Sequence, residues 1–464
     1  MPSSIVSIEL SNFKANLLEI VKNMEEPTPQ TFENFTKELY KTLMQTGLRL
    51  LREILNFWEP KENSIQVAEE GEFQYKKSEP KEFATLFGKV KISRRIYYNA
   101  RIQKTYVPLD SYWGMVGQYA TTEVRERIGY LTGFLNPKTI FNIFKRFTCY
   151  ALSQTTIAKI GSRIGKAFNE ANTVIVNEAH MQEKIPEQTQ TLAVSLDGVN
   201  VMLRESGSRA RRPRTRPGHD DPLKSGKSCY KNAGVATLSF YGRSNTNQEL
   251  FRIKSLFLAN SPEERMTSLK RELEAELAYY LSIASSQMRK VVIMDGARGL
   301  WKYIHQHELF KGWTYIVDFH HCCEHLSQFA EKLFGKNSAI GQKWYSKCRN
   351  RLLNDINGVH KVIRSAKRYL LDKGKKFLMK ELSYFVNNQR KVNYAVFRSQ
   401  GLPIGSGPVE AACKTIVKAR LCCSGMRWTR RRAQEILRIR TTIKNNRWNV
   451  AWLVCKYTPT SATN

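Results

Sequence analysis

The order of local sequence periods after residue 190 constrains the fold of this chain more than any other feature. Five short segments alternate or are continuously apolar, as strands are, and two longer segments repeat apolar residues at helical spacing. In chain order they are strands at 192–203, 232–242 and 249–259, a helix near 262–287, a strand at 291–296, a helix near 299–307 and a strand at 313–319. The sequence therefore predicts an α/β domain with a mixed five-stranded sheet and flanking helices.

Three strands, a helix, a strand, a helix and a strand is the order of a ribonuclease H-like sheet. In that layout, one acid on the first strand and another at the end of the fourth lie side by side. Asp197 occupies the first place and Asp295 the second. A third acid, Glu410, follows Pro408 in what reads as the first turn of a helix, after the flexible stretch 405–407. We therefore expect these three carboxylates to converge.

Converging carboxylates are the ligands of a two-metal site, because Mg²⁺ and Mn²⁺ prefer oxygen and two such ions can hold the attacking and leaving oxygens of a phosphoryl transfer. Each acid has a simpler reading. Asp197 and Asp295 each precede a glycine, as in turns, and Glu410 is favoured at a helix N-terminus by the helix dipole. The combination of all three in this order favours the catalytic reading.

The net charge indicates a polyanionic partner. The chain has 74 Lys and Arg against 41 Asp and Glu, a formal charge of +33, and its pI is near 9.8. Contacts of Lys and Arg with phosphates release counterions and so favour binding to any nucleic acid. Charge alone therefore does not distinguish a DNA partner from an RNA partner.

Basic residues cluster on either side of the proposed site, with tryptophans that could stack on bases. The alternative is that these runs are simply solvated faces. The residues expected to contact DNA are Arg209, Arg211, Arg212, Arg214, Arg216, Lys414, Lys418, Arg420, Arg427, Trp428, Arg430, Arg431 and Arg432, with Arg438, Arg440 and Trp448 nearby.

The N-terminal part alternates between helical and strand periods. Residues 1–58 read as helices, 70–110 as a short antiparallel hairpin, and 122–177 again as helices. Within the last segment, a helix that opens at Ser153 could be the recognition helix of a helix-turn-helix, although an ordinary helical hairpin has the same pattern. Its groove-facing residues would be Gln154, Thr155, Lys159 and Arg163.

The nine cysteines, an odd number without framework spacing, predict reduced thiols. Cys322 and Cys323 lie among three histidines, but the chain has no C-x-x-C knuckle, so thiols are favoured over a zinc site. No apolar run reaches the roughly 18 residues that span a bilayer, and the N-terminus lacks a secretory signal. We therefore expect a cytoplasmic protein without a membrane partner.

Four sequence blocks together resemble the DDE transposases of bacterial insertion sequences of the ISKra type. They are SLDGV, VVIMDGARGLW, VDFHHCCEHL and GSGPVEAACKTIVKARLCCSGMRW, of which the last is the most specific. The similarity extends over about residues 190–448, and the segment FGKVKISRRIYY is similar to the N-terminal region of the same transposases.

The resemblance implies a ribonuclease H-like catalytic domain that carries an all-helical insertion between the second and third acids. It implies that Asp197, Asp295 and Glu410 are catalytic and bind two Mg²⁺ or Mn²⁺ ions, with Asp318 and His321 as accessory residues. Asp318 also ends an apolar strand and competes with Asp295 as the second acid; the strand order favours Asp295. Asp318 and His321 could orient DNA or a leaving group, or could be a satisfied structural pair.

These inferences divide the chain into six regions. They are a helical and β-hairpin region at 1–115, a possible helix-turn-helix region at 116–188, the catalytic core at 189–321, a helical insertion at 322–400, the C-terminal part of the core with basic helices at 401–455, and a disordered tail at 456–464.

The expected function is insertion-sequence transposition. The protein would bind the terminal inverted repeats in double-stranded DNA, cut them and join them to target DNA, as a homodimer or larger assembly at the nucleoid of a prokaryotic cell. The alternatives are a transposon-derived DNA-binding protein without catalysis and a stand-alone metal-dependent DNA nuclease.

Overall fold

The computed structural model describes residues 2–24, 26–148, 150–204, 228–244, 249–296, 298–372 and 378–457. They form two compact units: Met1–Ile175 with Trp448–Asn464, and Val176–Arg447. The sequence placed residues up to 455 in the catalytic core, whereas helix α18 (Trp448–Cys455) belongs to the first unit. The reason is aromatic packing, because the Trp448 ring lies 5.3 Å from Phe168 and 5.2 Å from Tyr130.

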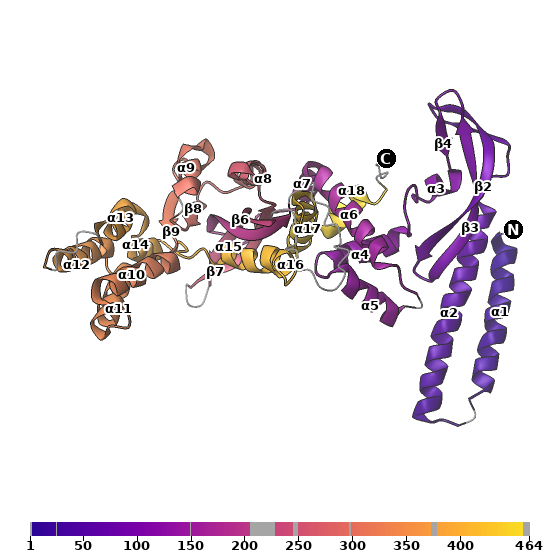
Figure 1. Cartoon of the computed structure of the whole chain (residues 1–464), viewed down its shortest axis with the longest axis horizontal. Coiled ribbons are helices and arrows are strands. Elements are labelled where there is room, and N and C mark those ends of the chain that lie inside the picture. The colour runs from indigo at the N-terminus through magenta and orange to yellow at the C-terminus, as the bar shows by residue number, and fades with distance from the viewer. Residues whose placement is uncertain are drawn as a thin grey trace, which may run out of the picture. The chain divides into compact units, whose positions relative to one another are not determined.

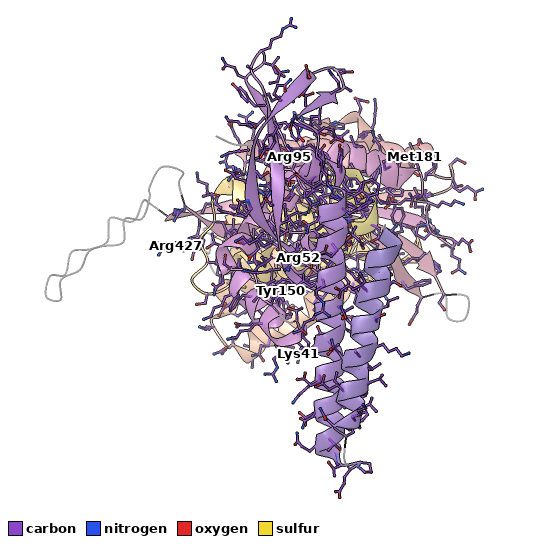
Figure 2. All side chains as sticks on the ribbon, turned by 90° about the vertical axis from the view of Figure 1, so that its right-hand side faces the viewer. Lys41, Arg52, Arg95, Tyr150, Met181 and Arg427 are labelled. Carbon is purple, nitrogen blue, oxygen red and sulfur yellow. The ribbon has the colours of Figure 1, made fainter. Side chains whose placement is uncertain are left out.

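Two long helices and a small sheet open the first unit. Helices α1 (Pro2–Lys22) and α2 (Pro29–Phe57) run side by side (Figures 1 and 2). Figure 2 shows basic side chains such as Lys41 and Arg52 along α2. The predicted hairpin is part of a four-stranded antiparallel sheet with the order β1-β2-β3-β4. Its strands are β1 (Ser64–Val67), β2 (Gly71–Thr85), β3 (Gly88–Asn99) and β4 (Lys104–Tyr106).

The helices expected over 122–177 are present, and α6 begins where the sequence indicated. The Oγ of Ser153 accepts a hydrogen bond from the Thr156 amide at 3.1 Å and caps that helix. Gly161 allows α6 to pack on α4, since a Cβ there would lie 2.6 Å from the Thr132 hydroxyl. The helices are α3 (Pro108–Tyr112), α4 (Thr122–Thr132), α5 (Pro137–Phe147), α6 (Gln154–Glu170) and α7 (Asn172–His180).

Gln154, Thr155 and Lys159 are exposed on α6, so the predicted groove contact stays possible for them. Arg163 is engaged within the unit. Its guanidinium donates to the Gly117 carbonyl and lies 4.8 Å from the centre of the Tyr119 ring.

The second unit contains the predicted five-stranded mixed sheet, in the order β7-β6-β5-β8-β9. Strands β5, β6 and β7 are antiparallel neighbours, and β8 and β9 run parallel to β5. The elements are β5 (Thr191–Arg204), β6 (Ser228–Arg243), β7 (Leu250–Asn260), α8 (Thr267–Ser282), β8 (Arg289–Met294), α9 (Arg298–Gln306) and β9 (Thr314–Val317).

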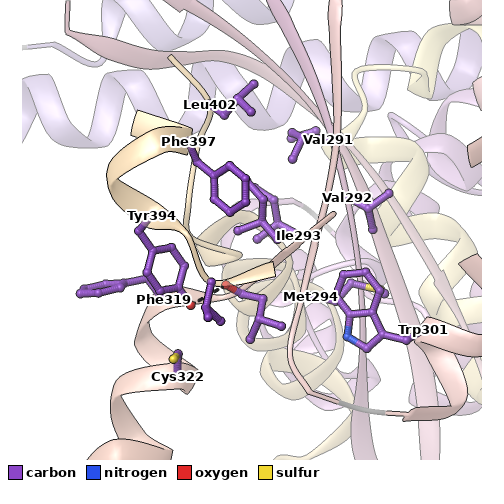
Figure 3. Packing of buried hydrophobic residues seen from close by; sticks show 14 of the residues in the cluster. Val291, Val292, Ile293, Met294, Trp301, Phe319, Cys322, Tyr394, Phe397 and Leu402 are labelled. Atoms are coloured by element: carbon purple, nitrogen blue, oxygen red, sulfur yellow. Dashed lines mark hydrogen bonds between the residues drawn. The ribbon is translucent and has the colours of Figure 1, made fainter. Parts of the chain in front are cut away.

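Alternation along β5 directs its side chains into two cores. Leu192, Val194 and Leu196 belong to a core that α8 covers with Leu269 and Leu273. Figure 3 shows the part of this core around β8, where Val291–Met294 lie among Trp301, Phe319 and Tyr394.

The opposite face of the sheet carries the second core. It joins the odd-numbered β5 residues Val199, Val201 and Leu203 to Val409 and Ile416 from the C-terminal helices. Those helices are α15 (Gly407–Ala412), the π-helical turn η5 (Cys413–Lys418), α16 (Ala419–Leu421) and α17 (Arg430–Lys444).

A run of helices connects β9 to α15, where the sequence predicted an all-helical region. They are α10 (Phe319–Phe334), α11 (Ala339–Asn354), α12 (Gly358–Asp372), α13 (Met379–Asn387) and α14 (Tyr394–Ser399). In Figure 1 they gather beyond β9 at one end of the sheet. Tyr394 anchors this group to the core by donating to the Val317 carbonyl at 2.9 Å.

Candidate active site

The first two acids lie on neighbouring parallel strands in matching positions. Strand β5 pairs with β8 so that Val194 is opposite Val292, an offset of 98 residues (292 − 194). The same offset, continued past the last hydrogen-bonded pair, places Asp197 opposite Asp295 (295 − 197). Residues in register on parallel strands point to the same face, so both carboxylates start from the same side of the sheet.

A third aspartate continues the row. Strand β8 pairs with β9 so that Met294 is opposite Val317, an offset of 23 (317 − 294), and one step further Asp295 is opposite Asp318. The amide of Asp318 donates to the Met294 carbonyl at 2.8 Å, which agrees with that register. This register puts three aspartates in a row on adjacent strands: Asp197 within β5, and Asp295 and Asp318 directly after the ends of β8 and β9.

Protein donors hold the Asp197 carboxylate on both sides. Its Oδ1 accepts from the Gly198 amide at 2.6 Å, and its Oδ2 accepts from the Cys413 thiol at 3.3 Å. The side chain is half-buried on the face that α15 and η5 cover.

Glu410 reaches the same face from the first turn of α15, as the sequence predicted. Pro408 begins the helix, and Glu410 Oε1 lies 3.2 Å from Ser406 Oγ. Glu410 and Cys413 are three residues apart and share one face of the helix, where such neighbours lie about 5–6 Å apart. Cys413, which contacts Asp197, therefore lies next to Glu410 on the same stretch of helix.

Asp318 is fully buried and committed to the protein. Its Oδ1 accepts from the His321 amide at 2.8 Å as the N-cap of α10, and its Oδ2 accepts from the amide and hydroxyl of Ser406, the latter at 2.9 Å. The carboxylate thus fastens the loop before α15 to the start of α10. Of the two sequence readings of Asp318, these contacts favour the satisfied structural one.

Within the described residues, one group of three side chains places its ligand atoms within 4.8 Å of one another: Asp318, His321 and Glu410. Asp197 and Asp295 are not part of it. His321 Nε2 lies 4.0 Å from Glu410 Oε1, and its Nδ1 lies 3.3 Å from the Glu324 carboxylate. Because Asp318 is enclosed and already accepts three hydrogen bonds, His321 and Glu410 are the members of this group open to a ligand.

The three predicted ligands suit divalent ions chemically. Asp197, Asp295 and Glu410 are each partly exposed and offer the hard oxygen atoms that Mg²⁺ and Mn²⁺ prefer. Among the described residues, however, the ligand atoms of Asp197, Asp295 and Glu410 do not form a group within 4.8 Å of one another, so the convergence that the sequence predicted is not complete in this conformation.

Two residues that the sequence did not indicate line the Asp295 side of the site. The rings of His325 and Tyr384 stack 3.9 Å apart, and burial lowers the pKa of His325. Burial, with Asp295 among the nearby negative groups, raises the pKa of Tyr384. The Tyr384 hydroxyl is buried without a hydrogen-bond partner among the described residues. These residues, like Ser406 and Cys413, lie outside any spacing pattern, so only the fold reveals them.

The basic residues after Glu410 separate into exposed and buried sets. Lys414, Lys418, Arg427, Arg430 and Arg431 are exposed, as a phosphate contact requires.

Three arginines of this region are structural in the folded chain. Arg420 is 4% exposed, its guanidinium lies 5.2 Å from the centre of the Trp428 ring, and burial lowers its pKa to about 10. Arg438 pairs with Glu272 at 2.6 Å, and Arg440 donates to the Ile416 carbonyl at 2.7 Å. The sequence could not separate these arginines from the exposed ones because all of them follow Glu410 in the same run.

The remaining predicted contacts are limited in different ways. Arg432 is half-buried and pairs with Glu435 at 2.5 Å. Trp428 is half-buried and donates to the Leu421 carbonyl at 3.1 Å. Trp448 is 8% exposed, so the stacking on bases suggested for it is wrong for this conformation. Arg209, Arg211, Arg212, Arg214 and Arg216 lie outside the described residues.

The described cysteines are free thiols, as expected. They are Cys322, Cys323, Cys348, Cys413, Cys422, Cys423 and Cys455. Burial raises the pKa of Cys322 and Cys323, which favours the protonated thiol over a metal-binding thiolate. None of the helices in the described ranges is long and apolar enough to cross a membrane.

Comparison with known protein families and with curated proteins finds no match for this sequence.

Proposed function

We propose that this protein is a DDE-type DNA transposase of the insertion-sequence class, with a ribonuclease H-like catalytic domain and Asp197, Asp295 and Glu410 as its metal ligands. The observation that carries the proposal is the pairing of β5 with β8: its register ends at Val194 and Val292, and its extension by three residues would bring Asp197 beside Asp295. Glu410 lies in the first turn of α15, which packs on this face of the sheet. The strand order and the helical run before α15 support it. The charge of +33 supports a DNA partner.

The site would use Mg²⁺ or Mn²⁺, which when bound activate a water or 3′-hydroxyl and stabilise the leaving oxygen. The chain's own residues orient Asp197, which accepts hydrogen bonds from the Gly198 amide and the Cys413 thiol. Exposed Lys414, Lys418 and Arg430 can bind the phosphates of the DNA. Joining two transposon ends to one target requires two sites, so the protein would act as a homodimer or larger assembly.

The test is incubation of the full chain with labelled DNA that carries the inverted repeats flanking its gene, with Mn²⁺ or Mg²⁺. We expect cleaved ends and joined products. Asp197→Ala and Glu410→Ala should each reduce cleavage at least about 100-fold, while Glu308→Ala, at an 85% exposed side chain that pairs with Lys311, should be active.

Other outcomes separate the competing functions. Nicks without joining would indicate a nuclease, and binding without cleavage would indicate a silent DNA-binding descendant. Full cleavage by both alanine variants would overturn the proposed site.

A further inference from the structure

Cys413 is the residue from the C-terminal helices that contacts Asp197 directly. Its Sγ lies 3.3 Å from Asp197 Oδ2, and the side chain is 5% exposed. The other oxygen, Oδ1, accepts from the Gly198 amide at 2.6 Å. Each oxygen of the carboxylate therefore accepts one hydrogen bond from the protein, and the remaining lone pairs point away from these two donors.

The helix changes form at this residue. It is α-helical to Ala412, π-helical over Cys413–Lys418, and α-helical again in α16. Single π turns inside α-helices are uncommon and often lie at functional sites. Ile416 and Val417 of the π turn are buried in the core that also contains Val199 and Val201 of β5. This packing fixes the position of the turn and keeps Cys413 close to Asp197.

The same helix also carries Glu410. Glu410 and Cys413 share a face, so one rigid element presents one proposed ligand and fixes the orientation of another. A shift of the helix would move both together.

We propose that Cys413 is a positioning residue: its thiol, as a hydrogen-bond donor, holds Asp197 in the rotamer that binds the divalent ion. This inference rests on the proposed function. A donor behind a ligating carboxylate orients it and usually changes metal affinity by about 10- to 100-fold when removed. A thiol is a weak donor, so the effect should fall near the lower limit of that range.

The experiment measures Mn²⁺ binding to the full chain by titration calorimetry and by the electron paramagnetic resonance of free Mn²⁺. Cys413→Ala should raise the dissociation constant about tenfold. Cys413→Ser should stay within about threefold of the native value, because its hydroxyl can donate in place of the thiol. Cleavage by Cys413→Ala should recover as Mn²⁺ is raised, since the chemical groups themselves are intact.

Cys423→Ala is the matched control. Its thiol donates to the Ala419 carbonyl of the preceding helix α16 at 3.3 Å and is exposed, so Mn²⁺ binding should not change. Native affinity in Cys413→Ala would overturn the positioning role. Equal weakening in Cys413→Ala and Cys413→Ser, with a matching loss of thermal stability in both, would also overturn it and indicate packing. Failure of the native chain to bind Mn²⁺ at all would instead refute the proposed function.

Discussion

At the scale of single residues, Asp295 and Asp318 show how similar sequence positions acquire different roles. Both follow apolar strands and share a register, yet Asp295 is partly exposed and Asp318 is fully buried. Asp318 caps α10 and binds Ser406. A buried carboxylate with three donors is costly to remove but poorly placed to bind an ion from solvent.

Alanine variants of the two aspartates should therefore have different effects, one mainly on the free energy of unfolding and the other on DNA cleavage. Asp318→Ala should lower the free energy of unfolding by about 2–4 kcal/mol, because a cap is lost and the Ser406 donors are left buried. Asp295→Ala, at a partly exposed side chain, should lower that energy less than Asp318→Ala does and should abolish cleavage. Urea unfolding and DNA cleavage measure the two effects. Retained activity in Asp295→Ala would assign the second acid to Asp318 instead.

At the scale of elements, a buried ionic cluster joins α7, α8 and Arg447, which lies three residues after the end of α17. Glu276 of α8 contacts His180 Nε2 at 2.8 Å and Arg447 Nη2 at 3.0 Å. Arg447 also pairs with Glu183 at 2.7 Å, and Tyr280 donates to Glu183 at 2.6 Å. Burial alone would raise the pKa of Glu276, but the bonds from His180 and Arg447 outweigh it and lower that pKa to about 2.

This cluster predicts a specific pH dependence of stability. The pKa of Glu276 is about 2 when folded and about 4.3 when unfolded, so its contribution is complete above about pH 4.3 and is lost as the pH falls toward 2. Glu276→Gln should destabilise the protein by about 3–5 kcal/mol at pH 6. The difference between native and variant should shrink at pH 3.

Urea unfolding at both pH values provides the measurement. Glu308→Gln, at an exposed side chain, serves as the control and should match the native protein at each pH. A difference for Glu276→Gln that is the same at pH 6 and pH 3 would contradict the assigned role of the cluster.

At the scale of the whole molecule, the excess of positive charge predicts salt-dependent DNA binding that depends on where the charge is exposed. Arg430 and Arg431 are exposed at the start of α17, with Arg431 at 73%. Replacing both by Gln should lower the slope of log K against log salt by up to about 2, since each phosphate contact contributes about 0.9.

The matched control removes the same charge elsewhere in the second unit. Arg265 and Lys311 are 85% and 81% exposed and pair with neighbouring glutamates. Replacing these two by Gln should change the slope much less. Equal slopes for both double variants would show that charge acts on DNA without a defined surface. Fluorescence anisotropy with labelled DNA over 50–200 mM salt gives the slopes.

Much of the fold could be predicted from local patterns. Alternation and helical spacing located all five strands of the second sheet, and the Ser153 cap located the start of α6. The positions of Asp197 in a strand and Glu410 in a first helical turn were also correct. These features depend on residues close together along the chain, where sequence periods carry the information.

The sequence predicted which residue types make up the candidate site, but it did not predict which of them are buried or what they contact. Arg420 and Arg440 are buried and Arg430 is exposed, but all three belong to the same basic stretch after Glu410. The sequence alone therefore does not distinguish the buried arginines from the exposed one. The stacking role suggested for Trp448 failed because its ring packs against Phe168 in another part of the fold. Burial is set by residues far apart in sequence, and no local pattern reports it.

By itself, the sequence determined the type and order of the elements, the charge, and the positions of three acids within a strand, after a strand and in a first helical turn, because backbone propensity and side-chain period act over a few residues. Only the tertiary structure decided which carboxylate stays open and which is enclosed. Strand pairing put β5 next to β8, Asp318 became enclosed where it binds Ser406 and the start of α10, and a π turn brought Cys413 to Asp197. Those outcomes depend on close packing between distant segments, which no single stretch of the chain contains.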